Sequence, residues 1–124
     1  MSVIELAKLL TELSGQEIYA VNFPSFTKGN FVKLEILSGI VETGGVQDFN
    51  IQLMFKSENH PAKAEASAID CINKLNMVTN KEFADGKYQL ILLRVSTPQP
   101  IFVGETQTGE FIFSVDFRVL TTKI

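Results

Sequence analysis

The sequence of 124 residues offers few side chains suited to catalysis or metal binding. It has a single histidine, His60, next to Pro61 at the expected start of a helix, and a single cysteine, Cys71. A nucleophilic triad would need His60 as its base, and no Gly-x-Ser-x-Gly motif accompanies it. One Cys and one His can make neither an internal disulfide nor a zinc site of the usual spacing. We expect His60 to be a solvated or capping residue and Cys71 to be a buried apolar thiol.

Acidic residues and glycines are the remaining candidates for chemistry. Glu58, Glu65 and Asp70 fall near one another on the same expected helix. Two such carboxylates can act as an acid/base pair, but charges in this setting are more typical of a solvated helix face. Gly44 and Gly45 join two expected strands and do not lead from a strand into a helix, so they indicate a turn and not a phosphate loop. The sequence therefore predicts no catalytic residues, no metal and no cofactor, and we expect a protein that is not an enzyme.

The amino-acid composition limits the kinds of partner that the protein is expected to bind. Eleven Lys and Arg against fourteen Asp and Glu give a net charge of −3, and the basic residues are scattered, which disfavours a phosphate-binding groove. Ten Phe against two Tyr and no Trp favour dry burial in a core or a subunit contact. No apolar run approaches the ~18 residues of a membrane helix, and the first residues lack the order of a signal peptide. We expect no membrane partner.

Periodicity and turn residues predict the elements. Ser2 and Glu5 form a capping-box pattern, after which apolar residues recur at helical spacing up to Gly15. Residues 17–23, 31–42, 48–56, 88–95 and 110–120 read as strands, and residues 62–75 as a second helix beginning near Pro61. Residues 80–87 are polar and are expected to be a loop. Thr43, Gly44, Gly45 and Val46 are expected to form the tip of a hairpin.

These elements predict one α+β domain over residues 1–124. Its simplest architecture is an antiparallel or mixed β-sheet of about four to five strands, with the two α-helices packed on one face. Phe49, Ile51, Leu53 and Phe55 alternate along one expected strand and should lie on its buried side.

The C-terminal residues carry a resemblance to a known family. Pro100, Gly104 and Gly109 precede a final strand in which apolar and polar residues alternate. This segment resembles the end of the tail terminator (tail completion) and minor capsid proteins of long-tailed bacteriophages. The resemblance extends to the length and the element order, so it covers most of the chain. The apolar positions of the final strand are Phe111, Phe113, Val115, Phe117 and Val119.

The resemblance implies a structural role without a cofactor. Such proteins form hexameric rings that cap a finished tail tube, stop its polymerisation and offer the surface that joins the head. The implied partners are further copies of the chain, the tail tube protein and the head–tail connector proteins, with DNA passing through the ring without specific binding. The implied location is the tail–neck junction of a virion, assembled in the bacterial cytoplasm. We expect subunit or tube contacts at Thr43, Gly44, Gly45, Val46, Phe111, Phe113 and Phe117.

Three alternatives stay open from the sequence. Within the same virion, the chain is also compatible with a head-completion adaptor or with the tail tube protein itself. From a different class, a small ligand-binding or enzymatic α+β domain would place an apolar pocket, lined by Phe side chains, between helix and sheet.

Overall fold

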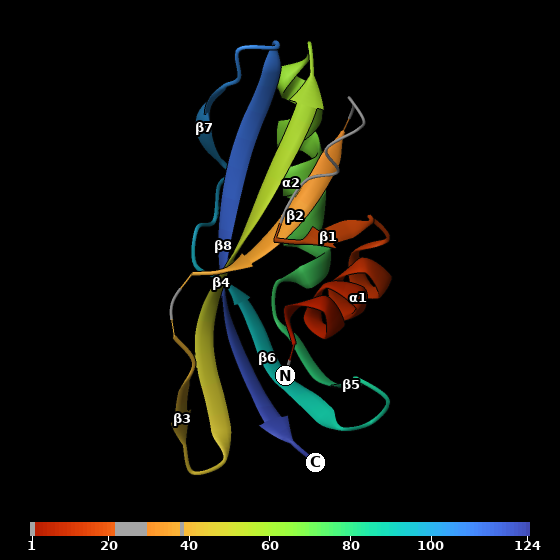
Figure 1. Ribbon diagram of the computed structural model, residues 1–124, viewed down its shortest axis with the longest axis vertical. Helices are drawn as coiled ribbons and strands as arrows, with labels where there is room; N and C mark the ends of the chain where they lie inside the picture. The colour runs from red at the N-terminus through yellow and green to blue at the C-terminus, as the bar shows by residue number, and fades with distance from the viewer. Residues whose placement is uncertain (1, 22–29, 38) are drawn as a thin grey trace.

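The computed structural model describes residues 2–21, 30–37 and 39–124 and is built around two long strands that cross the whole molecule (Figure 1). The long strands are β4 (Val46–Glu58) and β8 (Glu110–Lys123). They pair antiparallel without a break from Val46 opposite Thr122 to Glu58 opposite Glu110. The other elements are α1 (Val3–Ser14), β1 (Ile18–Ala20), β2 (Phe31–Ile36), β3 (Val41–Thr43), α2 (Pro61–Leu75), β5 (Val78–Phe83), β6 (Tyr88–Val95) and β7 (Ile101–Glu105).

Short strands extend the sheet on both sides of this central pair. Along β4, β3 pairs with the first residues of the strand and β2 with its later ones. Along β8, β7 pairs with the first residues and β6 with the last. β1 adds parallel to β2, and β5 adds antiparallel to β6. The result in the described residues is a mixed sheet of eight strands.

The expected number of four to five strands is therefore wrong, although the α+β class is kept. Residues 80–87, expected to be a loop, contain part of β5. The loop was expected because a strand without alternating buried residues has the same polar sequence pattern as a loop. β7 follows Pro100 directly and contains Gly104, and such residues interrupt a strand pattern. Residues 31–42 supply two strands, β2 and β3, that share β4 as a partner. Of the strand expected at 17–23, β1 covers Ile18–Ala20, and residues 22 and 23 lie outside the described residues, as does residue 38.

The two helices begin and end as their sequences predict. In α1 the Glu5 amide donates to Ser2 Oγ at 3.1 Å, and the Ser2 amide donates to Glu5 Oε1 at 3.0 Å, which completes the capping box. Gly15 ends the helix in the left-handed conformation, with φ at 73°. Pro61 occupies the first turn of α2. No helix among the described residues is long and apolar enough to cross a membrane.

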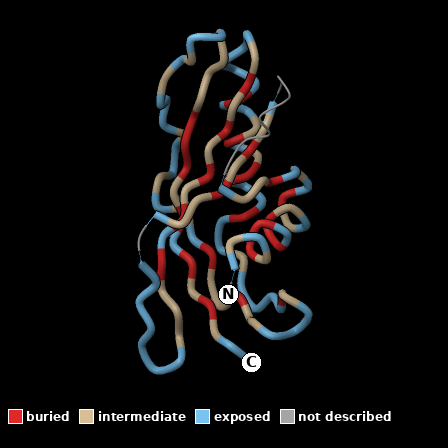
Figure 2. The backbone as a smooth tube through the Cα atoms, in the orientation of Figure 1, coloured by how far each residue is buried: buried red, intermediate tan, exposed pale blue. Residues whose placement is uncertain are grey.

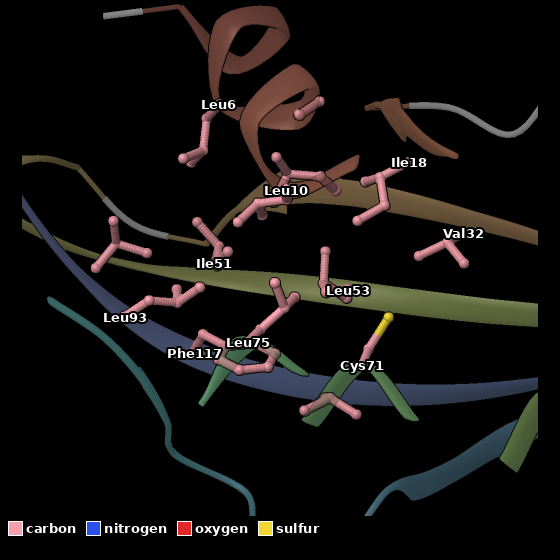
Figure 3. Close-up of a cluster of buried hydrophobic side chains, with 14 of the residues drawn as sticks. Leu6, Leu10, Ile18, Val32, Ile51, Leu53, Cys71, Leu75, Leu93 and Phe117 are labelled. Atoms are coloured by element: carbon pink, nitrogen blue, oxygen red, sulfur yellow. The ribbon is translucent and has the colours of Figure 1, made fainter. Parts of the chain in front are cut away.

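The core lies between the helices and one face of the sheet (Figure 3). Leu6 and Leu10 of α1 and Cys71 and Leu75 of α2 contribute fully buried side chains to it. From the sheet, the four alternating residues predicted on β4 are all at most 2 % exposed: Phe49, Ile51, Leu53 and Phe55. The predicted inward face of this strand is therefore confirmed.

Candidate functional site

The side chains that could take part in catalysis or metal binding lie apart from one another. His60 is the N-cap residue of α2, where it is exposed and makes no side-chain capping bond. Cys71 is completely buried, and this burial is the main reason that the pKa of its thiol is raised to about 12. A thiol with that pKa stays protonated near neutral pH and is a poor nucleophile. The predictions of a solvated His60 and a buried apolar Cys71 are confirmed.

The acidic residues expected on the second helix do not converge either, and Glu58 is the last residue of β4 and not part of α2. The Asp70 carboxylate accepts hydrogen bonds from Lys74 and Gln16 and forms an ion pair with Lys74 at 3.1 Å, and the Lys74 bond is the main cause of its lowered pKa. Glu65 is exposed, and Glu58 lies opposite Glu110 in the central ladder. Among the described residues, no three His, Cys, Asp or Glu side chains are placed to hold a metal ion.

The predicted hairpin tip is formed as expected and extends away from the helices (Figure 2). Thr43 pairs with Val46, and Gly44 and Gly45 between them have φ of 60° and 82°. Two central residues with positive φ define the type I′ turn that suits a two-residue hairpin. The hydroxyl of Thr122 in β8 donates to the Gly45 carbonyl at 3.0 Å. The tip is thus exposed at its end but fastened to the central pair.

The three phenylalanines predicted as contact residues lie elsewhere. Phe117 is fully buried and Phe113 is 7 % exposed, so their rings support the sheet from inside the chain. Phe111 is half-buried and lies opposite Ser57, eleven positions along β4 from the hairpin residue Val46. At strand spacing this is a separation of about 36 Å. The structure therefore does not bring the hairpin tip and these phenylalanines into one site.

The β7 edge is a surface that the sequence did not indicate. We use this name for Ile101, Phe102 and Val103, which are 52 %, 53 % and 51 % exposed. β7 pairs with β8 alone among the described strands, so its other edge has no strand beside it. The only signal in the sequence was a run of three apolar residues directly after Pro100. A run so short does not distinguish an exposed strand from a buried one.

A largely buried ion pair fixes the hairpin that carries the β7 edge. Glu110 forms an ion pair with Lys56 of β4 at 2.8 Å, with both side chains only about one-tenth exposed. The same carboxylate accepts a hydrogen bond from the Thr108 hydroxyl at 2.7 Å. The Lys56 bond, followed by the Thr108 bond, holds the pKa of Glu110 below its usual value. The edge is therefore presented on a fastened hairpin, with Phe102 against Phe113 at a centroid distance of 5.3 Å.

Ion pairs also occupy the sheet face that turns away from the core. Arg118 of β8 donates to Asp48 of β4 through Nε at 3.0 Å and through Nη2 at 2.6 Å. This bidentate pair raises the pKa of Arg118 and lowers that of Asp48. Lys33 of β2 pairs with Glu35 at 3.2 Å. These basic side chains are compensated by acids, which weakens their attraction for phosphate.

A hollow between α2 and strands β1, β2 and β4 is the place where a pocket between helix and sheet was expected. Its volume is about 210 Å³, below the roughly 300–1,000 Å³ of most ligand sites. Phe31 and Phe55 line it, but so do Gln16, Lys56 and Lys63. Two other hollows beside α1, of about 450 and 400 Å³, are more open to solvent. The Phe-lined apolar pocket is not formed in the described residues.

Comparison with known proteins gives a likeness of fold. No protein-family model and no curated protein matches the chain. Twelve chains of solved structures do match. One belongs to the virion of a native gene transfer agent particle. It superimposes with a TM-score of 0.63 over 92 % of this chain and 84 % of its own length, at 16 % sequence identity. The two chains share a fold.

Proposed function

We propose that this chain is a structural protein of a virion that assembles into a closed ring, caps a tail tube and provides the surface that joins the tail to the head. The observation that carries the proposal is the β7 edge, an exposed apolar strand edge on a protein whose potentially reactive residues lie apart. Exposed apolar patches on a soluble protein mark interaction sites. The fold shared with a chain of a gene transfer agent virion supports the broader part of the proposal, a structural protein of a virion.

A ring of this protein has dimensions suited to a tail. A spherical domain of 124 residues has a radius of gyration of about 14 Å and a diameter of roughly 35 Å, and the 14 residues of β8 make this molecule longer than that along one axis, about 46 Å. Six such bodies in a closed ring surround a hole about one body wide, which admits duplex DNA. The net charge of −3 and the ion-paired basic residues of the outer sheet face favour passage of DNA without binding.

Light scattering across a range of protein concentrations tests assembly. We expect a closed oligomer, either alone or on addition of the tube protein, since some rings close only on their template. A strict monomer under both conditions would overturn the proposal.

Electron microscopy of particles that lack this protein tests the specific role. Loss of a tail terminator should give overlong tails without heads. Tails of normal length that fail to join heads would point to a head-completion adaptor. Filaments formed by the purified protein alone would point to the tail tube.

A further inference from the structure

We infer that the β7 edge of one copy pairs with the β3–β4 hairpin of a second copy, so that two different strand edges of the same chain form the contact between neighbours. This inference rests on the proposed ring and names the surfaces that would close it. It begins with the contrast between the edges of the sheet.

The β7 edge, Ile101 to Val103, carries no charged side chain of the kind that usually protects an exposed strand. Natural proteins guard edge strands with charges, prolines, bulges or covering loops, because an unpaired row of N–H and C=O groups attracts another strand. β7 has a register shift between Phe102 and Gly104 and an exposed Glu105 at its end, which are two such devices, but its first three residues, Ile101 to Val103, are exposed and apolar. Another extended strand satisfies both its free hydrogen-bonding groups and its apolar side chains.

The β3–β4 hairpin supplies a second open edge with apolar side chains. β3 pairs with β4 alone among the described strands. Val41 in β3 is 62 % exposed, and Ile40 and Leu37 just before it are 39 % and 46 % exposed. Together with the β7 edge, these residues make up more than half of the large apolar side chains that the described residues expose. Figure 1 shows β3 and β7 on the same side of the molecule, away from α1.

The two edges cannot meet within one copy. β3 lies beside the first residues of β4, whereas β7 pairs with the part of β8 that lies opposite the last residues of β4. Along β4, the residues beside β3 (46–48) and those opposite the partners of β7 (54–57) are at least six positions apart, so the unbroken pairing of β4 with β8 separates the two edges by about 20 Å or more. The contact must therefore form between copies. Because it joins two different surfaces, it is heterologous, and repetition of such a contact closes a ring when the rotation permits.

Thiol cross-linking between copies tests this pairing. One variant carries Val41→Cys and a second carries Val103→Cys, and the two are mixed at a concentration where light scattering shows assembly. A short bifunctional thiol reagent is then added. The native Cys71 is fully buried with a raised pKa, so it does not compete. We expect at least a tenfold excess of the mixed dimer over the dimers that each variant forms alone.

Controls separate the outcomes. Thr79→Cys on β5 replaces Val103→Cys in a matched mixture and should give no dimer above background. Dimers formed by Val103→Cys alone would show β7 pairing with itself and would overturn the inference. Assembly without any cross-link between positions 41 and 103 would also overturn it, while leaving the ring intact. A β7 cross-link that forms only with the tube protein would assign the edge to that partner instead. A strict monomer, alone and with the tube protein, would overturn the ring and the inference together.

Discussion

β5 and β7 both form edges of the same sheet, but they divide their side chains differently between core and surface. β5 exposes Thr79, Asn80, Lys81 and Glu82 and turns Phe83 inward, where the ring is 7 % exposed. β7 exposes its apolar residues, including Phe102 at 53 %. A phenylalanine thus anchors one edge strand to the core and lies largely outside it on the other.

The difference indicates which edge is closed to pairing and which is open. Lys81 and Glu82 place charges along β5, and Asn80 between its paired residues has a positive φ of 55°, which interrupts a regular strand. Such an edge is a poor template for another strand. The β7 edge carries no charge from Ile101 to Val103. We therefore expect that the free edge of β5 does not pair with another strand and that the free edge of β7 does.

Truncation of the two phenylalanines should give the largest contrast. Phe83→Ala removes a buried ring and should lower the free energy of unfolding by about 3–5 kcal/mol. Phe102→Ala removes a half-exposed ring whose main described contact is the edge of Phe113, and should cost about 1 kcal/mol. Urea unfolding of the monomer measures both. Equal losses would contradict the distinction drawn between the two edges.

A single lysine on each edge should separate assembly from folding. Val103→Lys places an ammonium in the proposed contact, and burying it unpaired should weaken self-association by about 100-fold, or roughly 3 kcal/mol. Thr79→Lys adds the same charge to β5 and should leave association unchanged. Neither substitution should alter monomer stability by more than about 0.5 kcal/mol. Analytical ultracentrifugation gives the association constants, and equal weakening by both variants would refute a specific role for β7.

The sequence predicted the elements that have strong local signals. The capping box at Ser2 and Glu5, the glycine pair at the hairpin and the alternation along β4 each reflect a requirement of backbone geometry or one-sided burial, and all three are confirmed. The open edge was not predicted, because Ile101, Phe102 and Val103 lack alternation and follow a proline. Strand partners were beyond reach as well, since no local pattern shows that β2 and β3 share one long strand.

The predicted contact residues also differ in how strong their local sequence signals are. The hairpin tip was found because two adjacent glycines suit one turn type and such turns lie at surfaces. The chemical character of Phe113 and Phe117 predicts contact residues, but a Phe-rich strand with alternating residues has the same sequence pattern whether it faces its own core or a neighbour. Both side chains are buried within this chain, so they face its own core.

The ion pair that fastens the β7–β8 hairpin should make the stability of this region depend on pH. The folded pKa of Glu110 lies below its ordinary value of 4.5, so its stabilising contribution is present above about pH 4.5 and is lost as the pH falls through the folded pKa. Glu110→Gln should lower stability near neutral pH by about 1–3 kcal/mol and flatten the acid limb of the curve. Urea unfolding between about pH 3 and pH 7 measures this. Glu82→Gln on β5 is the control, and an acid limb as steep in Glu110→Gln as in the original protein would contradict the assignment.

The smallest effect concerns the turns that lead out of the two edge strands. Gly109 follows β7 with φ of 81°, and Gly86 follows β5 with φ of 77°. A Cβ at Gly109 would lie 3.6 Å from Asn59 Oδ1, and a Cβ at Gly86 would lie 4.0 Å from Glu82 Oε2, and both are ordinary contacts. The loss of stability on substitution by Ala therefore comes from the positive φ of the backbone and should be about 1 kcal/mol at each position. Hydrogen exchange should locate faster opening in β7 for Gly109→Ala and in β5 for Gly86→Ala. If β7 is the open edge, Gly109→Ala alone should weaken self-association, by about fivefold. An equal loss from Gly86→Ala would mean that assembly follows the stability of the whole sheet and not the position of its β7 edge.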